Sequence, residues 1–141
     1  MRVCVIDGRG GGLGNRLVAG LYAELGRTHH IVALGTNTVA AAAMRQAGAE
    51  QVGVGSRAIA ETVSTADVIV ASLNMVLPGA MLGEVTPEIV RAILAARAKK
   101  VLLPVNRARL EVVGAGGYTL EALIAQSLSR VRCLVSSARP L

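Results

Sequence analysis

The fold is decided by one stretch near the start of the chain, Arg2-Val3-Cys4-Val5-Ile6-Asp7-Gly8-Arg9-Gly10-Gly11-Gly12-Leu13-Gly14. Its apolar run, residues 3–6, predicts a buried strand, and glycines crowd the turn that follows. A helix is then predicted from the spacing of a set of apolar residues, and Gly26 ends it. These apolar residues are Leu13, Leu17, Val18, Leu21 and Leu25. Strand, glycine turn and helix in this order open a nucleotide-binding βαβ unit.

The glycines of the turn have two explanations, and both stay open at this point. A phosphate can lie against backbone N–H groups at a helix N-terminus only where no Cβ holds it off. Alternatively, the glycines serve only the tight packing of the strand against the helix. The spacing is G-x-x-x-G-x-G, with Gly8, Gly12 and Gly14 at the glycine positions. The more familiar G-x-G-x-x-G spacing does not fit, because Leu13 stands at its last position when counted from Gly8.

The rest of the chain alternates predicted strands with predicted helices. We expect strands at 30–34, 51–54, 68–71, 101–105 and, at an edge, 110–113. Helices are expected to begin near Thr38, Ser56, Thr86 and Thr119, which are good N-cap residues. This order predicts an α/β fold with a single Rossmann-like three-layer domain. Its sheet should be mostly parallel and open, with five to six strands and helices on both faces.

Composition agrees with one such domain. The chain has 141 residues, of which 52% are hydrophobic and 17% charged, with two Tyr and neither Phe nor Trp. An aliphatic core of this kind suits the buried strands of a parallel sheet. We expect residues 1–129 to form the nucleotide-binding domain and residues 130–141 to form a basic C-terminal tail or an extra strand.

Charge and cysteine usage indicate the compartment and the partners. The net charge of +6 favours a small anionic ligand. Nucleic acid is not expected, because the basic residues are scattered and no aromatic residues lie among them. Cys4 and Cys133 form no metal pattern and fit a reducing compartment. The uncharged stretch 68–83 is shorter than the roughly 20 residues that span a membrane. We therefore expect a soluble cytoplasmic protein without a metal site.

Ligands of open parallel sheets bind outside the carboxyl ends of the strands. That edge should collect the glycine turn and the polar residues that follow the other strands. The predicted cofactor-binding residues are Gly8, Arg9, Gly10, Gly11, Gly12, Leu13, Gly14, Gly35, Thr36, Asn37, Ser72, Asn74, Asn106 and Arg107.

The loop after the second predicted strand bears on the identity of the cofactor. In NAD-binding folds, an acidic residue at this strand end binds the ribose hydroxyls. Here the residues are the neutral Gly35, Thr36 and Asn37. A neutral loop with Arg9 nearby tolerates a 2′-phosphate, which favours NADP over NAD. Equally, Thr36 and Asn37 could serve only the N-terminus of the next helix.

Two further features remain open. Asp7 would repel a phosphate unless its carboxylate is turned away, pairs with Arg9 or holds a cation. The simpler interpretation is that Asp7 accepts hydrogen bonds from the N–H groups of its own turn. The loop 72–85 is long and apolar, which favours a lid, a ligand wall or an oligomer contact. A short extra helix packed on the core is the alternative.

Several blocks of the chain resemble a family of small bacterial proteins known only as a domain of unknown function and described as Rossmann-like. These blocks are Val5–Gly14, Ala33–Asn37, Ala47–Ala49, Met81–Pro87 and Pro104–Asn106. The resemblance implies a fold and no activity. The glycine turn also resembles, more remotely, that of short-chain dehydrogenases. Their catalytic Tyr-x-x-x-Lys is absent. The position that the lysine would take is Gly26 when counted from Tyr22 and Ala122 when counted from Tyr118.

Three functions follow from these patterns. The first is a nucleotide-binding or dinucleotide-binding protein of unknown cellular role, with NADP as the leading ligand and Arg9 neutralising the pyrophosphate. The second is a structural or regulatory homodimer that needs no cofactor and uses the loop 72–85 as its interface. The third is a small enzyme acting on a nucleotide-like substrate, with Asp7 or Glu84 as the base.

Overall fold

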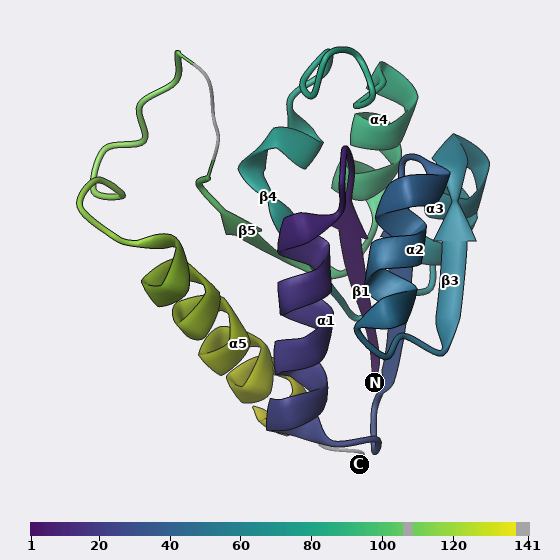
Figure 1. The fold of residues 1–141 in the computed structure, drawn as a ribbon, viewed down its shortest axis with the longest axis vertical. Coiled ribbons are helices and arrows are strands. Elements are labelled where there is room, and N and C mark those ends of the chain that lie inside the picture. The colour runs from purple at the N-terminus through teal and green to yellow at the C-terminus, as the bar shows by residue number, and fades with distance from the viewer. Residues whose placement is uncertain (106–108, 138–141) are drawn as a thin grey trace.

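Five parallel strands form one sheet in the order β3-β2-β1-β4-β5 (Figure 1). The computed structural model describes residues 1–105 and 109–137. The strands are β1 (Arg2–Asp7), β2 (His30–Gly35), β3 (Gln51–Val54), β4 (Val68–Ser72) and β5 (Lys99–Leu103). The chain builds outward from β1 to β3 and then crosses back to β4. The carboxyl ends of β1 and β4 therefore lie side by side at a topological switch point.

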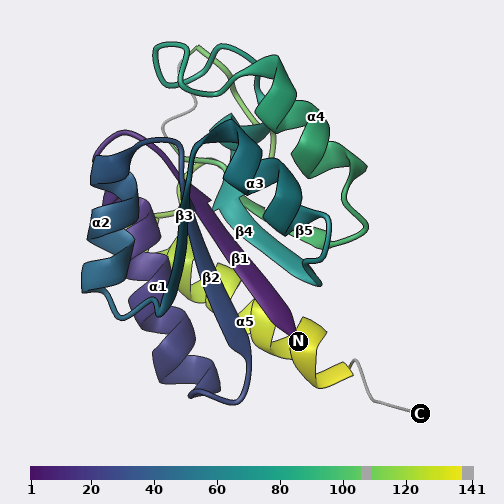
Figure 2. The same cartoon turned by 90° about the vertical axis from the view of Figure 1, so that its right-hand side faces the viewer.

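Helices cover both faces of the sheet (Figure 2). One face carries α1 (Gly12–Leu25), α2 (Thr38–Gln46) and α5 (Leu120–Ser137), and the other carries α3 (Gly55–Val63) and α4 (Pro87–Ala95). Alternate residues of β1 serve the two cores: Val3 and Val5 pack on the α1 side, and Cys4 and Ile6 on the α3 side. This is the predicted α/β fold with helices on both faces. In the described part of the chain, no helix is both long and apolar enough to cross a bilayer.

The helix starts follow local chemistry. Thr86 accepts a hydrogen bond from the N–H of Ile89 at 3.2 Å, with proline at the first helical position, which confirms the predicted start of α4. In α2 the capping residue is Asn37 rather than Thr38, because the side-chain Oδ1 of Asn37 accepts a hydrogen bond from the N–H of Ala40 at 2.8 Å. In α3, Ser56 lies inside the helix and caps nothing.

Two expectations about the C-terminal third are wrong. Residues 110–113 form no strand, and Val113 is fully exposed at 100%. A β-branched run needs a pleated neighbour, and here the chain leaves the sheet after β5. Residues 130–137 are neither a tail nor a strand, because they continue α5 with Val131 and Val135 buried one turn apart.

The loop 72–85 folds back on itself beyond β4. It begins with a short 3-10 helix, η1 (Leu73–Val76), whose Met75 is buried, and Val85 is buried at its end. Between them, turns carry Leu82, which is 93% exposed. The expected short helix is therefore present, and it is followed by an ordered loop, residues 77–85, that reaches back toward the glycine turn.

Candidate functional site

A cavity of about 420 Å³ opens at the switch point between β1 and β4. Its volume lies within the range of small-molecule sites. One wall is the turn from Asp7 to Leu13, and the opposite wall is residues 80–82 of the loop 77–85. Ser72, Asn74 and Val105 complete the lining.

This cavity brings together many of the predicted cofactor-binding residues. Those that line it are Gly8, Arg9, Gly10, Gly11, Gly12, Leu13, Ser72 and Asn74. Four others lie outside its lining, namely Gly14, Gly35, Thr36 and Asn37. Asn106 and Arg107 lie outside the described residues.

Three glycines of the turn are explained by the packing of the protein itself. Gly11 has a φ of 72°, and a Cβ there would lie 2.8 Å from the backbone of Ala40. A Cβ on Gly14 would lie 2.8 Å from the Cβ of Asp7. A Cβ on Gly8 would lie 2.7 Å from the Thr36 hydroxyl. At these positions the glycines let β1, α1 and α2 approach one another.

Gly10 and Gly12 have no such explanation. Neither has a positive φ. A Cβ added to either would have no described atom within 4 Å, apart from those of its chain neighbours and of its own helix backbone. Both residues line the cavity. Because glycine lowers stability relative to alanine at an ordinary backbone geometry, these two positions indicate a ligand that approaches the bare backbone.

Asp7 holds the turn in place. The residue is 5% exposed, and its carboxylate accepts hydrogen bonds from the N–H of Gly8 at 2.8 Å and from the N–H of Gly14 at 2.7 Å. Burial raises the pKa of Asp7, and the charge of Glu84 adds to the rise, whereas the two N–H donors lower it. The simpler interpretation of Asp7 is confirmed, since the N–H groups of its own turn bind the carboxylate.

Two buried side-chain polar atoms in the described part of the chain have no hydrogen-bond partner, Nε of Arg2 and Oγ of Ser72, and only Ser72 lines the cavity. Ser72 ends β4 and is 3% exposed, and its Oγ has no hydrogen bond to any part of the chain that the structure describes. Its neighbour across the cavity is the N-terminus of α1, where the N–H groups of Gly12 and Leu13 have no acceptor within the helix. Three donors therefore line one cavity, and a buried hydroxyl of this kind needs an acceptor.

Asn74 has a supporting role at the same edge. Its side-chain amide donates to the carbonyl oxygen of Val105 at 3.3 Å, which ties η1 to the segment after β5. This contact orders the wall of the cavity.

Glu84 occupies the place where the adenosine ribose was expected. Its Oε1 accepts from the N–H of Arg9 at 3.0 Å, the hydroxyl of Thr36 at 2.7 Å and the amide of Asn37 at 2.7 Å. These donors lower the pKa of Glu84, the Thr36 hydroxyl most strongly, although partial burial opposes them. Thr36 and Asn37 are themselves neutral, but a carboxylate from the loop 77–85 lies against both of them. No short sequence pattern signals this contact, since 48 residues separate Thr36 from Glu84.

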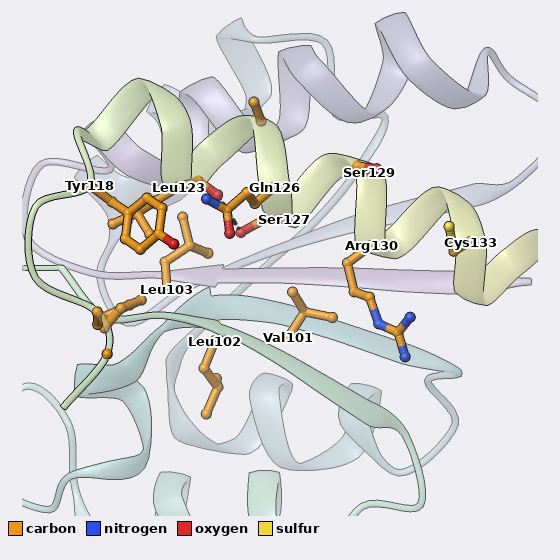
Figure 3. Close-up of a pocket in the computed structure, with 14 residues that line it drawn as sticks. Val101, Leu102, Leu103, Tyr118, Leu123, Gln126, Ser127, Ser129, Arg130 and Cys133 are labelled. Carbon is orange, nitrogen blue, oxygen red and sulfur yellow. Dashed lines mark hydrogen bonds between the residues drawn. The ribbon is translucent and has the colours of Figure 1, made fainter. Parts of the chain in front are cut away.

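A second and larger cavity, of about 880 Å³, lies between β5 and α5 (Figure 3). Its walls are mostly apolar, with Tyr118 toward one end and Arg130 and Cys133 toward the other. The buried Ser127 hydroxyl is satisfied, because it donates to the Leu123 carbonyl at 2.8 Å. None of the predicted cofactor-binding residues lines this cavity. We therefore place the candidate ligand site in the smaller cavity, where unsatisfied donors converge.

Both carboxylates beside the cavity are held by hydrogen bonds. Asp7 gives both carboxylate oxygens to backbone N–H groups, and Glu84 gives one oxygen to three donors. Within the described residues, no three His, Cys, Asp or Glu side chains are placed to hold a metal ion.

The two carboxylates should give opposite pH dependences of stability. The pKa of Glu84 is lowered, so its contribution to the free energy of unfolding is present above the usual pKa of glutamate and is lost as pH falls through the folded value. The pKa of Asp7 is raised, so its contribution is present below the usual pKa of aspartate and is lost as pH rises through the folded value. Glu84→Gln should reduce the loss of stability as pH falls, and Asp7→Asn should reduce the loss of stability as pH rises.

Urea unfolding between about pH 3 and about pH 7 measures both effects. Glu88→Gln, on the first turn of α4, is the matched control. If stability of the Glu84→Gln variant fell with acid as steeply as that of the wild type, the assigned contacts of Glu84 would be wrong.

Comparisons with known proteins supply a family and no activity. No curated protein matches the chain. A crystal structure of a dodecameric FMN-dependent UbiX-like decarboxylase from Escherichia coli O157:H7 is similar over 99% of this chain and 96% of that chain, with a TM-score of 0.48 and 13% identity. Residues 2–136 match the family described as Domain of unknown function (DUF3842), and the chain belongs to that family.

Proposed function

We propose that this protein binds a phosphate-bearing nucleotide in the cavity between the glycine turn and the end of β4. The phosphate faces the N–H groups of Gly12 and Leu13 and the hydroxyl of Ser72. The observation that carries the proposal is the buried Ser72 hydroxyl without a partner, which faces the same cavity as two glycines that packing does not explain. A helix N-terminus and a hydroxyl donor together suit an oxyanion.

The charge distribution supports an anionic ligand in spite of Asp7. The carboxylate of Asp7 is bound to Gly14, the third residue of α1, which leaves the earlier N–H groups for the ligand. Arg9 lines the cavity and brings a positive charge to its rim. The chain as a whole carries a net charge of +6, which attracts nucleotides.

NADP, the nucleotide that the sequence favours, fits this site less well than a mononucleotide. Its adenosine ribose and 2′-phosphate would lie near Thr36 and Asn37, where the carboxylate of Glu84 accepts hydrogen bonds from both side chains. Two negative groups in contact repel each other. The ligand class that we propose is therefore a mononucleotide.

A thermal-shift panel tests the proposal. AMP, ATP, FMN, NADH, NADPH and S-adenosylmethionine are added in turn, and a ligand at 100 times its dissociation constant stabilises the fold by about 2.7 kcal/mol. Ser72→Ala should lose the shift while the unliganded protein unfolds at a similar temperature, because only an unpaired hydroxyl is removed. Ser129→Ala, which lines the larger cavity, is the control and should keep the shift. A panel without any shift would exclude the proposal.

The two classes of glycine give a second test. Gly12→Ala should leave stability within about 1 kcal/mol of the wild type, because the position is open and helical, and it should weaken nucleotide binding at least about tenfold. Gly11→Ala should lower the stability itself, because it combines a positive φ with a contact to the Ala40 backbone. Calorimetric titration and urea unfolding measure the two effects. Full binding by the Gly12→Ala variant would mean that the phosphate lies elsewhere.

We also propose that the chain forms a homodimer, the second function that the sequence predicts. The loop 72–85 exposes one large apolar side chain, Leu82, whereas its Met75 and Val85 are buried within the protein. The segment that joins β5 to α5 exposes more apolar side chains, since Leu110 is 49%, Tyr118 53% and Val113 100% exposed. Tyr118 also lines the larger cavity. A second copy of this chain that docks there would bury the exposed side chains and cover the cavity.

Light scattering tests this assembly. We expect the mass of a dimer for the wild type and the mass of a monomer for Val113→Asp, because a charge would enter the buried surface. Val39→Asp, a 63% exposed position on α2, is the matched control and should remain dimeric. A wild type that is monomeric at every concentration would exclude the interface.

A further inference from the structure

The loop 77–85 covers one side of the glycine turn. A Cβ on Gly8 would lie 2.8 Å from the sulfur of Met81 and 3.2 Å from Oε1 of Glu84. The surface of Gly8 on this side is therefore filled by two side chains from a segment that lies more than 70 residues further along the chain. On the other side of the turn, Gly10 and Gly12 remain open to the cavity.

The covered side is the path that a dinucleotide would need. In an open parallel sheet of this topology, the pyrophosphate lies at the N-terminus of the first helix and the adenosine ribose lies at the carboxyl end of β2. Between these two points a dinucleotide passes over the turn. Here Met81 lies on the turn and Glu84 lies against Thr36 and Asn37 at the end of β2. The open cavity stops short of both Thr36 and Asn37.

The loop 77–85 is folded on itself, so it acts as a formed wall. The N–H of Gly79 donates to the carbonyl of Val85 at 2.7 Å, and the N–H of Val85 donates to the carbonyl of Ala80 at 3.1 Å. Glu84 then fastens the loop to the turn and to the end of β2 through its three donors. For the loop 77–85 to move out of the path of a ligand, all three hydrogen bonds to Glu84 must break.

We infer that Met81 and Glu84 are the specificity-determining residues of the site, which admit a mononucleotide and exclude dinucleotides. Met81 excludes the adenosine half by its volume over Gly8, and Glu84 excludes a 2′-phosphate by its charge. In dinucleotide-binding folds, the acidic residue at the end of β2 binds the ribose. In this chain the carboxylate at that place is Glu84, which comes from the loop after β4 and occupies the ribose position. This inference rests on the proposed function.

The test compares mononucleotides with dinucleotides on matched variants. AMP and FMN serve as the mononucleotide probes, and NAD and NADP as the dinucleotide probes, each titrated calorimetrically. Wild type should bind one mononucleotide at least about tenfold more tightly than either dinucleotide. The double variant Met81→Ala, Glu84→Ala should gain at least about tenfold for a dinucleotide, and the ratio of its dinucleotide affinity to its mononucleotide affinity should rise by at least about tenfold. Glu88→Ala on α4 is the control and should change neither affinity.

A milder variant separates charge from volume and guards against misfolding. Glu84→Gln keeps an oxygen that can accept hydrogen bonds from Arg9, Thr36 and Asn37, and it removes the negative charge. It should shift the preference between the two dinucleotides toward NADP while NAD changes little. Hydrogen exchange at the amides of residues 79–85 reports whether the loop keeps its fold in each variant.

The outcomes distinguish this inference from the proposed function. Equal binding of mononucleotides and dinucleotides by the wild type, or a double variant that gains no dinucleotide affinity, overturns the inference alone when mononucleotide binding still depends on Ser72. Nucleotide binding that is absent, or that does not depend on Ser72, overturns both.

Discussion

The site depends on the carboxylate of Asp7, which accepts hydrogen bonds from the N–H groups of Gly8 and Gly14. These two contacts join the end of β1 to the third residue of α1 and fix the path of the turn between them. Charge-assisted hydrogen bonds of this kind offset the unfavourable burial of a carboxylate. Because Asp7 is bound to Gly14, the donors left to a ligand are the first N–H groups of α1 and the hydroxyl that β4 brings beside them.

The glycine turn serves two purposes that lie on different sides of the backbone. Gly11 and Gly14 face the protein, where a Cβ would strike α2 or β1. Gly10 and Gly12 face the cavity, where the described residues leave room. Packing therefore explains Gly11 and Gly14, and the ligand explanation is the one that we propose for Gly10 and Gly12. Ser72, buried without a partner in the described chain, lies on the ligand side.

Sequence patterns succeeded where a structure is set by nearby residues. The β1 strand, the glycine turn and the capped start of α4 depend on residues a few positions apart, and all three were predicted. The segment 110–113 has the composition of a strand, yet strand formation also needs pairing with a neighbouring strand, and this segment does not pair with the edge strand β5. In α5, Val131 and Val135 keep a helical spacing that the arginines between and beside them obscured.

The sequence by itself determined the parallel α/β fold, and it assigned most of the cavity-lining residues to one edge of the sheet, because hydrophobic period and turn chemistry are local properties. The tertiary structure alone decided which glycines face the cavity and that Glu84 lies against Thr36 and Asn37 at the end of β2. Glu84 meets the N–H of Arg9 across 75 residues of chain. A contact between residues so far apart in the sequence forms only when the sheet and its loops are packed, so no local pattern could predict it.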